Sequence, residues 1–90
     1  MVFVLNDEQL KLCKRYVMQV YEADKSKLKI CDLSNKIIVD ENVINDFMDA
    51  ADYAIIHFGM VNQDYLTPLG CKLQFLYDEL LYQKKQQLKK

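Results

Sequence analysis

The chain has 90 residues, and we expect one domain because domains usually run to about 100–150 residues. We also expect its core to be too small to enclose a large catalytic cleft. Apolar residues make up 51 % of the chain and charged residues 28 %, which is typical of a globular protein and excludes a disordered one. The net charge of −1 gives no sign of a strongly basic nucleic-acid-binding protein. No apolar run approaches the ~20 residues of a membrane span, and no signal peptide is visible, so we expect a cytoplasmic protein without a membrane partner.

The charges are unevenly distributed along the chain. Residues 40–64 contain six acidic residues and no Lys or Arg, so all 12 cations lie outside this block. A concentrated acidic block bears more directly on the kind of partner than the total charge does.

Three cysteines, Cys13, Cys31 and Cys71, are too far apart for a C-x-x-C pair. Neither a zinc site nor a thioredoxin-type site is therefore expected. Without a secretory signal we expect reduced thiols that behave as small buried apolar side chains. The alternative is that one of them forms a disulfide across a dimer, which is rare in a reducing cytoplasm.

The first helix is predicted over residues 7–23. Asn6 and Gln9 stand at the two positions of a capping box, which satisfies free N–H groups at a helix start. From Leu10 to Val20 apolar residues recur at spacings of three and four, which indicates one buried helical stripe.

The middle of the chain predicts a short strand followed by two helices. Polar and apolar residues alternate before and within 27–30, which favours the strand. Asp32 is placed to cap a short helix over 32–39, and Asp40 to cap a longer helix over 41–54. Helices joined this closely indicate a helix-turn-helix unit.

The last third predicts a small hairpin and a long helix. Residues 55–58 and 65–67 suit two strands, with Gly and Asn turn signals between them. Thr67 then suits an N-cap and Pro68 the first helical position, so a helix is expected over 68–88. The expected fold class is therefore mostly α with a small β-hairpin, an α+β fold.

The order of these elements resembles a winged helix-turn-helix domain. Residues 32–47 (DLSNKIIVDENVINDF) look like the positioning helix, turn and recognition helix of that family, found in small archaeal, archaeal-virus and bacterial regulators. Residues 65–70 (YLTPLG) are similar to the stretch that leaves the wing and opens the last helix. The resemblance implies a single winged-helix domain over 1–90, with the helix-turn-helix over about 32–54, the wing over about 55–67 and the C-terminal helix over about 68–88.

The resemblance also implies a function: a non-enzymatic transcriptional regulator that binds double-stranded DNA as a homodimer, with its third helix in the major groove. The candidate DNA contacts are the cations around the first short strand and the polar residues of the third helix: Lys25, Lys27, Lys29, Lys36, Asn42, Asn45 and Asp46. Surface charge that keeps the protein soluble is the simpler interpretation of the lysines.

The acidity of the third helix favours a different partner. A DNA reader needs cations to neutralise phosphates, and carboxylates brought close to phosphates repel them. The alternative is a protein-interaction module, or a DNA mimic, that docks a basic partner. Its candidate docking residues are Glu41, Asp46, Asp49 and Asp52. A solvated helix face without any partner is the third interpretation.

The last helix predicts a homodimer. About 20 residues of helix are ~30 Å long, more than a small domain covers on every side. A second apolar stripe would stay exposed and mark an interface: Phe75, Leu81, Tyr82 and Leu88. The alternative is that Phe75 and Tyr82 pack on the first helix.

Nothing in the sequence indicates catalysis. The single histidine, His57, has no nucleophile and orienting partner placed around it, so a structural role is expected. The chain also lacks a glycine-rich phosphate loop and the spacing of a metal site. We therefore expect no enzyme activity, no cofactor and no metal.

Overall fold

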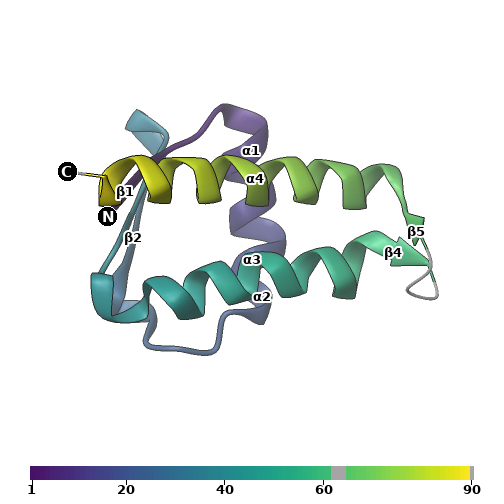
Figure 1. Ribbon diagram of the computed structural model, residues 1–90, viewed down its shortest axis with the longest axis horizontal. Helices are drawn as coiled ribbons and strands as arrows, with labels where there is room; N and C mark the ends of the chain where they lie inside the picture. The colour runs from purple at the N-terminus through teal and green to yellow at the C-terminus, as the bar shows by residue number, and fades with distance from the viewer. Residues whose placement is uncertain (62–64, 90) are drawn as a thin grey trace.

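The computed structural model describes residues 1–61 and 65–89, in which helices pack on one face of a small antiparallel sheet (Figure 1). The α+β class is confirmed. In chain order the elements are β1 (Val2–Val4), α1 (Asp7–Leu12), a π-helical turn η1 (Cys13–Val17), α2 (Met18–Val20), η2 (Lys25–Lys27), β2 (Leu28–Cys31), η3 (Asp32–Ser34), β3 (Lys36–Val39), η4 (Glu41–Val43), α3 (Ile44–Gly59), β4 (Met60–Val61), β5 (Tyr65–Leu66) and α4 (Pro68–Leu88), where η2, η3 and η4 are 3₁₀ turns.

The first helix forms where the sequence predicts it. The helical segments α1, η1 and α2 follow one another from Asp7 to Val20, three residues short of the expected end. The capping box is confirmed, because the Gln9 N–H donates to Asn6 Oδ1 over 2.7 Å and the Asn6 N–H to Gln9 Oε1 over 3.1 Å. Cys13 is the first residue of the π-helical turn, and its side chain is fully buried in the core.

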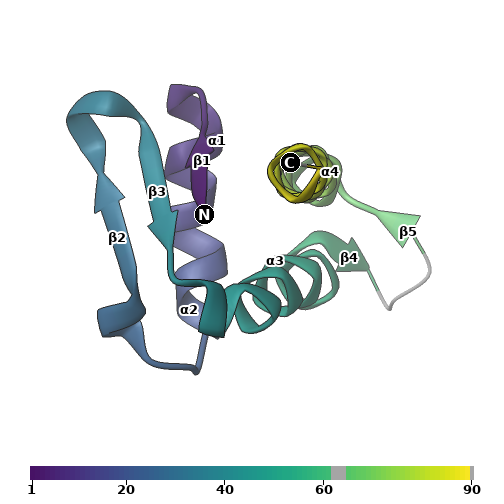
Figure 2. The ribbon, with the colours of Figure 1, turned by 60° about the vertical axis from the view of Figure 1, so that its left-hand side comes forward.

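The three-stranded sheet has the order β1-β3-β2, with both neighbours antiparallel to β3 (Figure 2). The strand β2 lies one residue beyond the predicted 27–30. The strand β1 was not predicted, because three apolar residues at a chain start carry no periodicity and form a strand only once β3 offers them a ladder.

The predicted helix over 32–39 is wrong, and the helix-turn-helix pair over 32–54 therefore lacks its first helix. One 3₁₀ turn covers Asp32–Ser34, and Asn35 follows in the left-handed conformation with φ 52° and ψ 44°. The chain then continues as β3. Asparagine tolerates the left-handed region better than most residues, and three consecutive β-branched residues, Ile37, Ile38 and Val39, favour a pleated strand over a helix.

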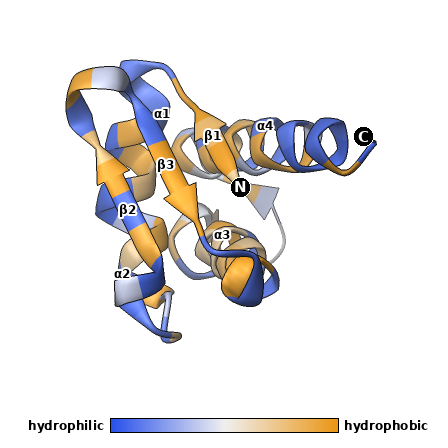
Figure 3. Cartoon of the chain, turned by 90° about the vertical axis from the view of Figure 1, so that its left-hand side faces the viewer, coloured by the Kyte–Doolittle hydropathy of each residue, from blue (hydrophilic) through white to orange (hydrophobic). Residues whose placement is uncertain are grey.

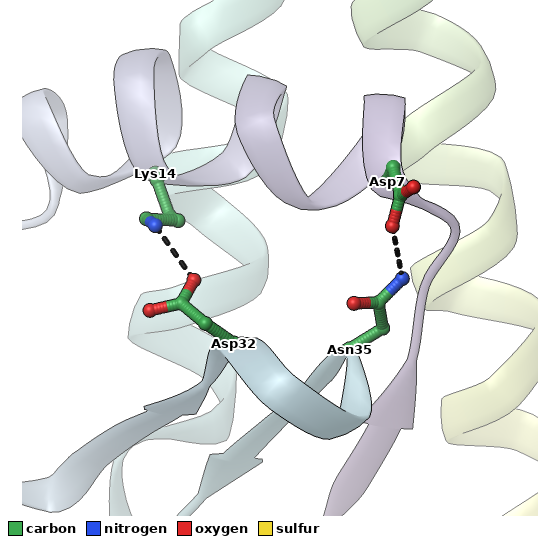
Figure 4. Close-up of polar contacts among 4 residues, drawn as sticks. All are labelled: Asp7, Lys14, Asp32 and Asn35. Carbon is green, nitrogen blue, oxygen red and sulfur yellow. Dashed lines mark hydrogen bonds and ion pairs between the residues drawn. The ribbon is translucent and has the colours of Figure 1, made fainter.

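Two polar contacts hold this β2–β3 turn against α1 and η1 (Figure 4). Lys14 Nζ lies 2.6 Å from Asp32 Oδ1, and Asn35 Nδ2 donates to Asp7 Oδ1 over 2.6 Å. Both contacts are exposed, so each stabilises the fold only weakly. Together they tie the two ends of the turn to one helix.

The predicted strand over 55–58 is also wrong, because α3 continues through these residues to Gly59. The expected long helix over 41–54 is confirmed, with η4 as its first turn. The hairpin is correspondingly smaller than the predicted wing and consists of β4 and β5. Residues 62–64 of that wing lie outside the described residues. The C-terminal helix over 68–88 is confirmed as α4.

The two glycines of the chain meet where α3 and α4 are joined. A Cβ atom built on Gly70 would overlap the Gly59 carbonyl oxygen, and one built on Gly59 would overlap the Gly70 Cα. Thr67 bridges the same two residues. Its N–H donates to the Gly59 carbonyl over 2.8 Å, and its Oγ1 accepts from the Gly70 N–H over 3.1 Å. Absence of side chains thus allows the two helix ends to approach.

The core lies between the sheet and the helices. Phe3 from β1 and Phe47 from α3 are fully buried and stack with 5.8 Å between ring centroids. Leu76 and Leu80 from α4 join the same cluster. Apolar and polar residues alternate along β2 (Figure 3), as expected for a sheet with one face on the core and one on solvent. Of the described helices, none is both long and apolar enough to cross a membrane.

Candidate functional site

The predicted acidic residues of the third helix all lie on the surface. Asp46, Asp49 and Asp52 are exposed on α3, and Glu41 is exposed one turn earlier, in η4. The opposite side of α3 is buried and includes Phe47, Met48, Ala51 and Ile55. The 3.6-residue period thus separates an acidic face from an apolar one.

The structure places part of this face in a groove that the sequence did not predict. The end of α2 and the residues after it face α3 across an open groove of about 340 Å³. Three carboxylates, one tyrosine and three apolar residues line it: Glu22, Asp46, Asp49, Tyr53, Val20, Ala23 and Ala50. We call this the acidic groove. Glu41 and Asp52 lie outside it.

The groove has no internal counter-charge. Residues 44–59 contain no Lys or Arg. Among the residues that the structure describes, the ion pairs are Lys14 with Asp32 and Lys72 with Glu8, and neither touches the groove. The neighbouring Tyr21 responds to this negative charge: burial raises the pKa of its hydroxyl, and the carboxylates of Asp46 and Asp24 raise that pKa further.

The lysines that were predicted to contact DNA do not lie on the same surface as the third helix. Lys25 and Lys27 lie in η2, Lys29 in β2 and Lys36 in β3. Register places Lys29 opposite Ile38, and Lys36 two residues before Ile38, so both lysines project from the outer face of the sheet.

A second groove contains part of this basic set. Lys27 and Lys29 line it together with Ser26, Leu28, Ile38 and Asp40. Asn42, Asn45 and Asp46 lie on η4 and α3 instead, so the seven candidate DNA contacts divide between two surfaces.

The sequence analysis did not predict a series of neighbouring aromatic rings. The ring centroids of Tyr16 and Phe58 are 5.1 Å apart, those of Phe58 and His57 are 4.6 Å apart, and those of His57 and Tyr53 are 5.6 Å apart. The guanidinium of Arg15 lies 5.6 Å from the Tyr16 ring. Tyr53, His57 and Phe58 all lie on α3, and the packing of η1 against α3 adds Tyr16 to them. The series ends at Tyr53, on the wall of the acidic groove.

The predicted dimer residues fall on more than one side of α4. Phe75, Tyr82 and Leu88 are 69 %, 60 % and 62 % exposed, whereas Leu81 packs partly against the core. Phe75 and Tyr82 are seven residues apart and share one helix face. The alternative was that Phe75 and Tyr82 pack on the first helix: Phe75 borders a pocket together with Glu8, Gln9 and Leu12 of that helix, but neither ring is buried. The homodimer through α4 stays a prediction.

His57 lies on the surface of α3 and not in a strand. Its neighbours are the rings of Tyr53 and Phe58. In residues 1–61 and 65–89, no three side chains of His, Cys, Asp or Glu are grouped so that they could hold a metal ion. Of the cysteines, Cys13 is buried as expected, Cys31 is half-buried and Cys71 is exposed.

Comparison of the chain with protein-family models, with curated proteins and with solved structures finds no match. The structure itself defines an α+β domain with an acidic groove beside α3.

Proposed function

We propose that this protein is a non-enzymatic interaction module that binds a basic segment of a partner protein in the acidic groove. The observation that carries the proposal is the convergence of Glu22, Asp46 and Asp49 on one groove without a cation of their own. Like-signed charges held together are stabilised by a partner of the opposite sign, which also steers the encounter.

The shape of the groove suits a lysine or arginine side chain. The aliphatic stem of such a residue would lie over Val20, Ala23 and Ala50, while its charged head reaches the carboxylates. The exposed ring of Tyr53 adds a surface on which a cation can stack. Because an exposed ion pair contributes only about 0.2–1 kcal/mol, a partner needs several cations in series. We therefore expect moderate affinity that falls steeply with salt.

The test is a titration with a fluorescent nine-residue peptide in which Lys and Ala alternate. Reversing two charges, Asp46→Lys with Asp49→Lys, should weaken binding at least tenfold, which is about 1.4 kcal/mol or more. Anisotropy at low salt measures the affinity, and circular dichroism confirms that the variant stays folded.

Asp78→Lys is the matched control for Asp49→Lys, since each reverses one exposed aspartate on a long helix and Asp78 lies on α4, away from the groove. The control should bind like the wild type. Equal weakening by both single variants would mean that only the total charge matters and would contradict a built site. If the wild type does not bind the peptide, the proposal is wrong.

DNA binding is the second candidate, carried by the shared outer sheet face of Lys29 and Lys36. The resemblance to winged-helix regulators remains an expectation, and the segment that the family uses as a positioning helix is the strand β3 in this chain. If double-stranded DNA binds, we expect the sheet and not α3 to contact its phosphates, since the sheet carries lysines whereas α3 contains no Lys or Arg.

A 20-base-pair duplex titrated over a range of salt concentrations tests this second candidate. Lys29→Gln with Lys36→Gln should lower the slope of log affinity against log salt by about 2, because each substitution leaves one phosphate without its cation. An unchanged slope would show that Lys29 and Lys36 do not contact phosphates, which would contradict binding through the sheet, and no binding at low salt would exclude double-stranded DNA as a partner.

A further inference from the structure

The two edges of the three-stranded sheet differ in whether their outward backbone groups have hydrogen-bond partners. On the β1 edge, two glutamines of α4 take the place of a neighbouring strand. The Gln87 amide accepts from the Val2 N–H over 3.0 Å and donates to the Val2 carbonyl over 2.8 Å. Gln83 makes the same pair of bonds with Val4, over 2.8 and 2.7 Å. All four outward backbone groups of Val2 and Val4 are therefore satisfied.

In the part of the chain that the structure describes, no other strand lies alongside the β2 edge (Figure 2). The Asp40 N–H donates to the Lys27 carbonyl over 3.0 Å, so Lys27, Lys29 and Cys31 turn their backbone groups toward β3. The carbonyl of Leu28 and both backbone groups of Ile30 consequently face outward. Within the described part of the chain, no hydrogen bond is made to these three groups.

The side chains around this edge are basic and apolar. Lys25, Lys27 and Lys29 are all exposed there, and Leu28 and Ile30 are half-buried. Asp32, at the far end of the strand, is already paired with Lys14. An incoming strand would thus meet one donor, two acceptors and a row of cations.

We propose that the β2 edge binds an acidic, extended segment of a partner protein, which adds to the sheet as a fourth strand. Exchange of both backbone bonds with Ile30 fixes the register, and the lysines select a segment with alternating carboxylates. This site lies on the sheet and is independent of the acidic groove on α3, so the two proposals can fail separately.

Lysines at a sheet edge have another known use, which is to prevent edge-to-edge aggregation. The two roles predict different results when the lysines are removed. If the lysines only prevent aggregation, the variant without them should self-associate. If they recognise a partner, the variant should no longer bind the acidic segment.

The probe is an acetylated and amidated seven-residue peptide of alternating Glu and Val, added to the ¹⁵N-labelled full chain. We expect the Ile30 amide to shift and its hydrogen exchange to slow at least tenfold at saturation. Because strand pairing uses every second N–H, methylating one alternate set of peptide nitrogens should weaken binding at least ~10-fold and methylating the other set should not.

Lys27→Gln with Lys29→Gln should also weaken peptide binding at least ~10-fold, while the matched pair Lys84→Gln with Lys85→Gln on α4 should not. Any of three results would overturn the proposal: no binding at millimolar peptide, equal weakening by both methylated sets, or a Lys27/Lys29 variant that binds the peptide normally, whether or not it self-associates. A duplex DNA that shifts the Ile30 amide while the peptide does not would assign the edge to the DNA candidate instead.

Discussion

Gly70→Ala should destabilise the protein by at least about 3 kcal/mol, although alanine is the better helix former. In an ordinary helix interior this substitution gains about 1 kcal/mol. Here the new Cβ would overlap the carbonyl oxygen of Gly59 and lie 2.8 Å from its carbonyl carbon. Backbone atoms cannot move aside as a side chain can, so the junction of α3 and α4 must open.

Urea unfolding followed by circular dichroism measures this effect. The neighbouring Cys71→Ala is the matched control, because its side chain is exposed on the same helical turn, and it should change stability by less than about 0.5 kcal/mol. Gly59→Ala should cost as much as Gly70→Ala, and the double variant should cost much less than their sum, since both open the same junction. A Gly70→Ala protein of normal stability would show that the two helices are not this close.

Above pH 9 the buried thiol of Cys13 should cost the protein stability. Burial raises its pKa from 9.0 to about 12, because the thiolate is poorly solvated in the core. The unfolded chain therefore loses this proton near pH 9 and the folded chain near pH 12. Between these values the folded state binds more protons, so stability is fully present below pH 9 and falls by up to about 1.4 kcal/mol per pH unit as the pH rises.

The measurement compares wild type and Cys13→Ala in urea at several values between pH 8 and pH 11. Cys13→Ala loses packing by a fixed amount at every pH, but its stability should fall less steeply, with a difference of about 2–3 kcal/mol accumulated by pH 11. Tyr21 adds a loss of the same sign, and it adds it in both proteins. Parallel pH profiles for the two proteins would contradict a shifted thiol.

The acidic groove shows how much of the site the sequence could predict. Spacing along α3 was enough to place Asp46 and Asp49 on an exposed face, because a helix fixes which residues share a side. Glu22 could not be predicted as part of the groove, since it lies more than twenty residues before Asp46 and reaches the groove only through the packing of α2 on α3. The same holds for Tyr16 and Phe58 of the aromatic series.

The two wrong elements have a common physical cause. Residues 37–39 and 55–58 are short runs rich in apolar and β-branched residues, and a run this short cannot be assigned to helix or strand from its periodicity alone. Ile37, Ile38 and Val39 became a strand because β1 and β2 lie on either side to pair with them. Residues 55–58 stayed helical because Ile55 continues the buried stripe of α3 onto the core.

What the sequence determined by itself is local. The capping box at Asn6, the Thr67-Pro68 helix start and the acidic, cation-free third helix each depend on residues within one or two turns of one another. The tertiary structure decided whatever needs a partner distant in the chain: the central place of β3, the meeting of Gly59 with Gly70, and the glutamine cover on one sheet edge that leaves the other open. Strand pairing and close backbone approach are satisfied by atoms far away in sequence, and no local pattern records where those atoms will lie.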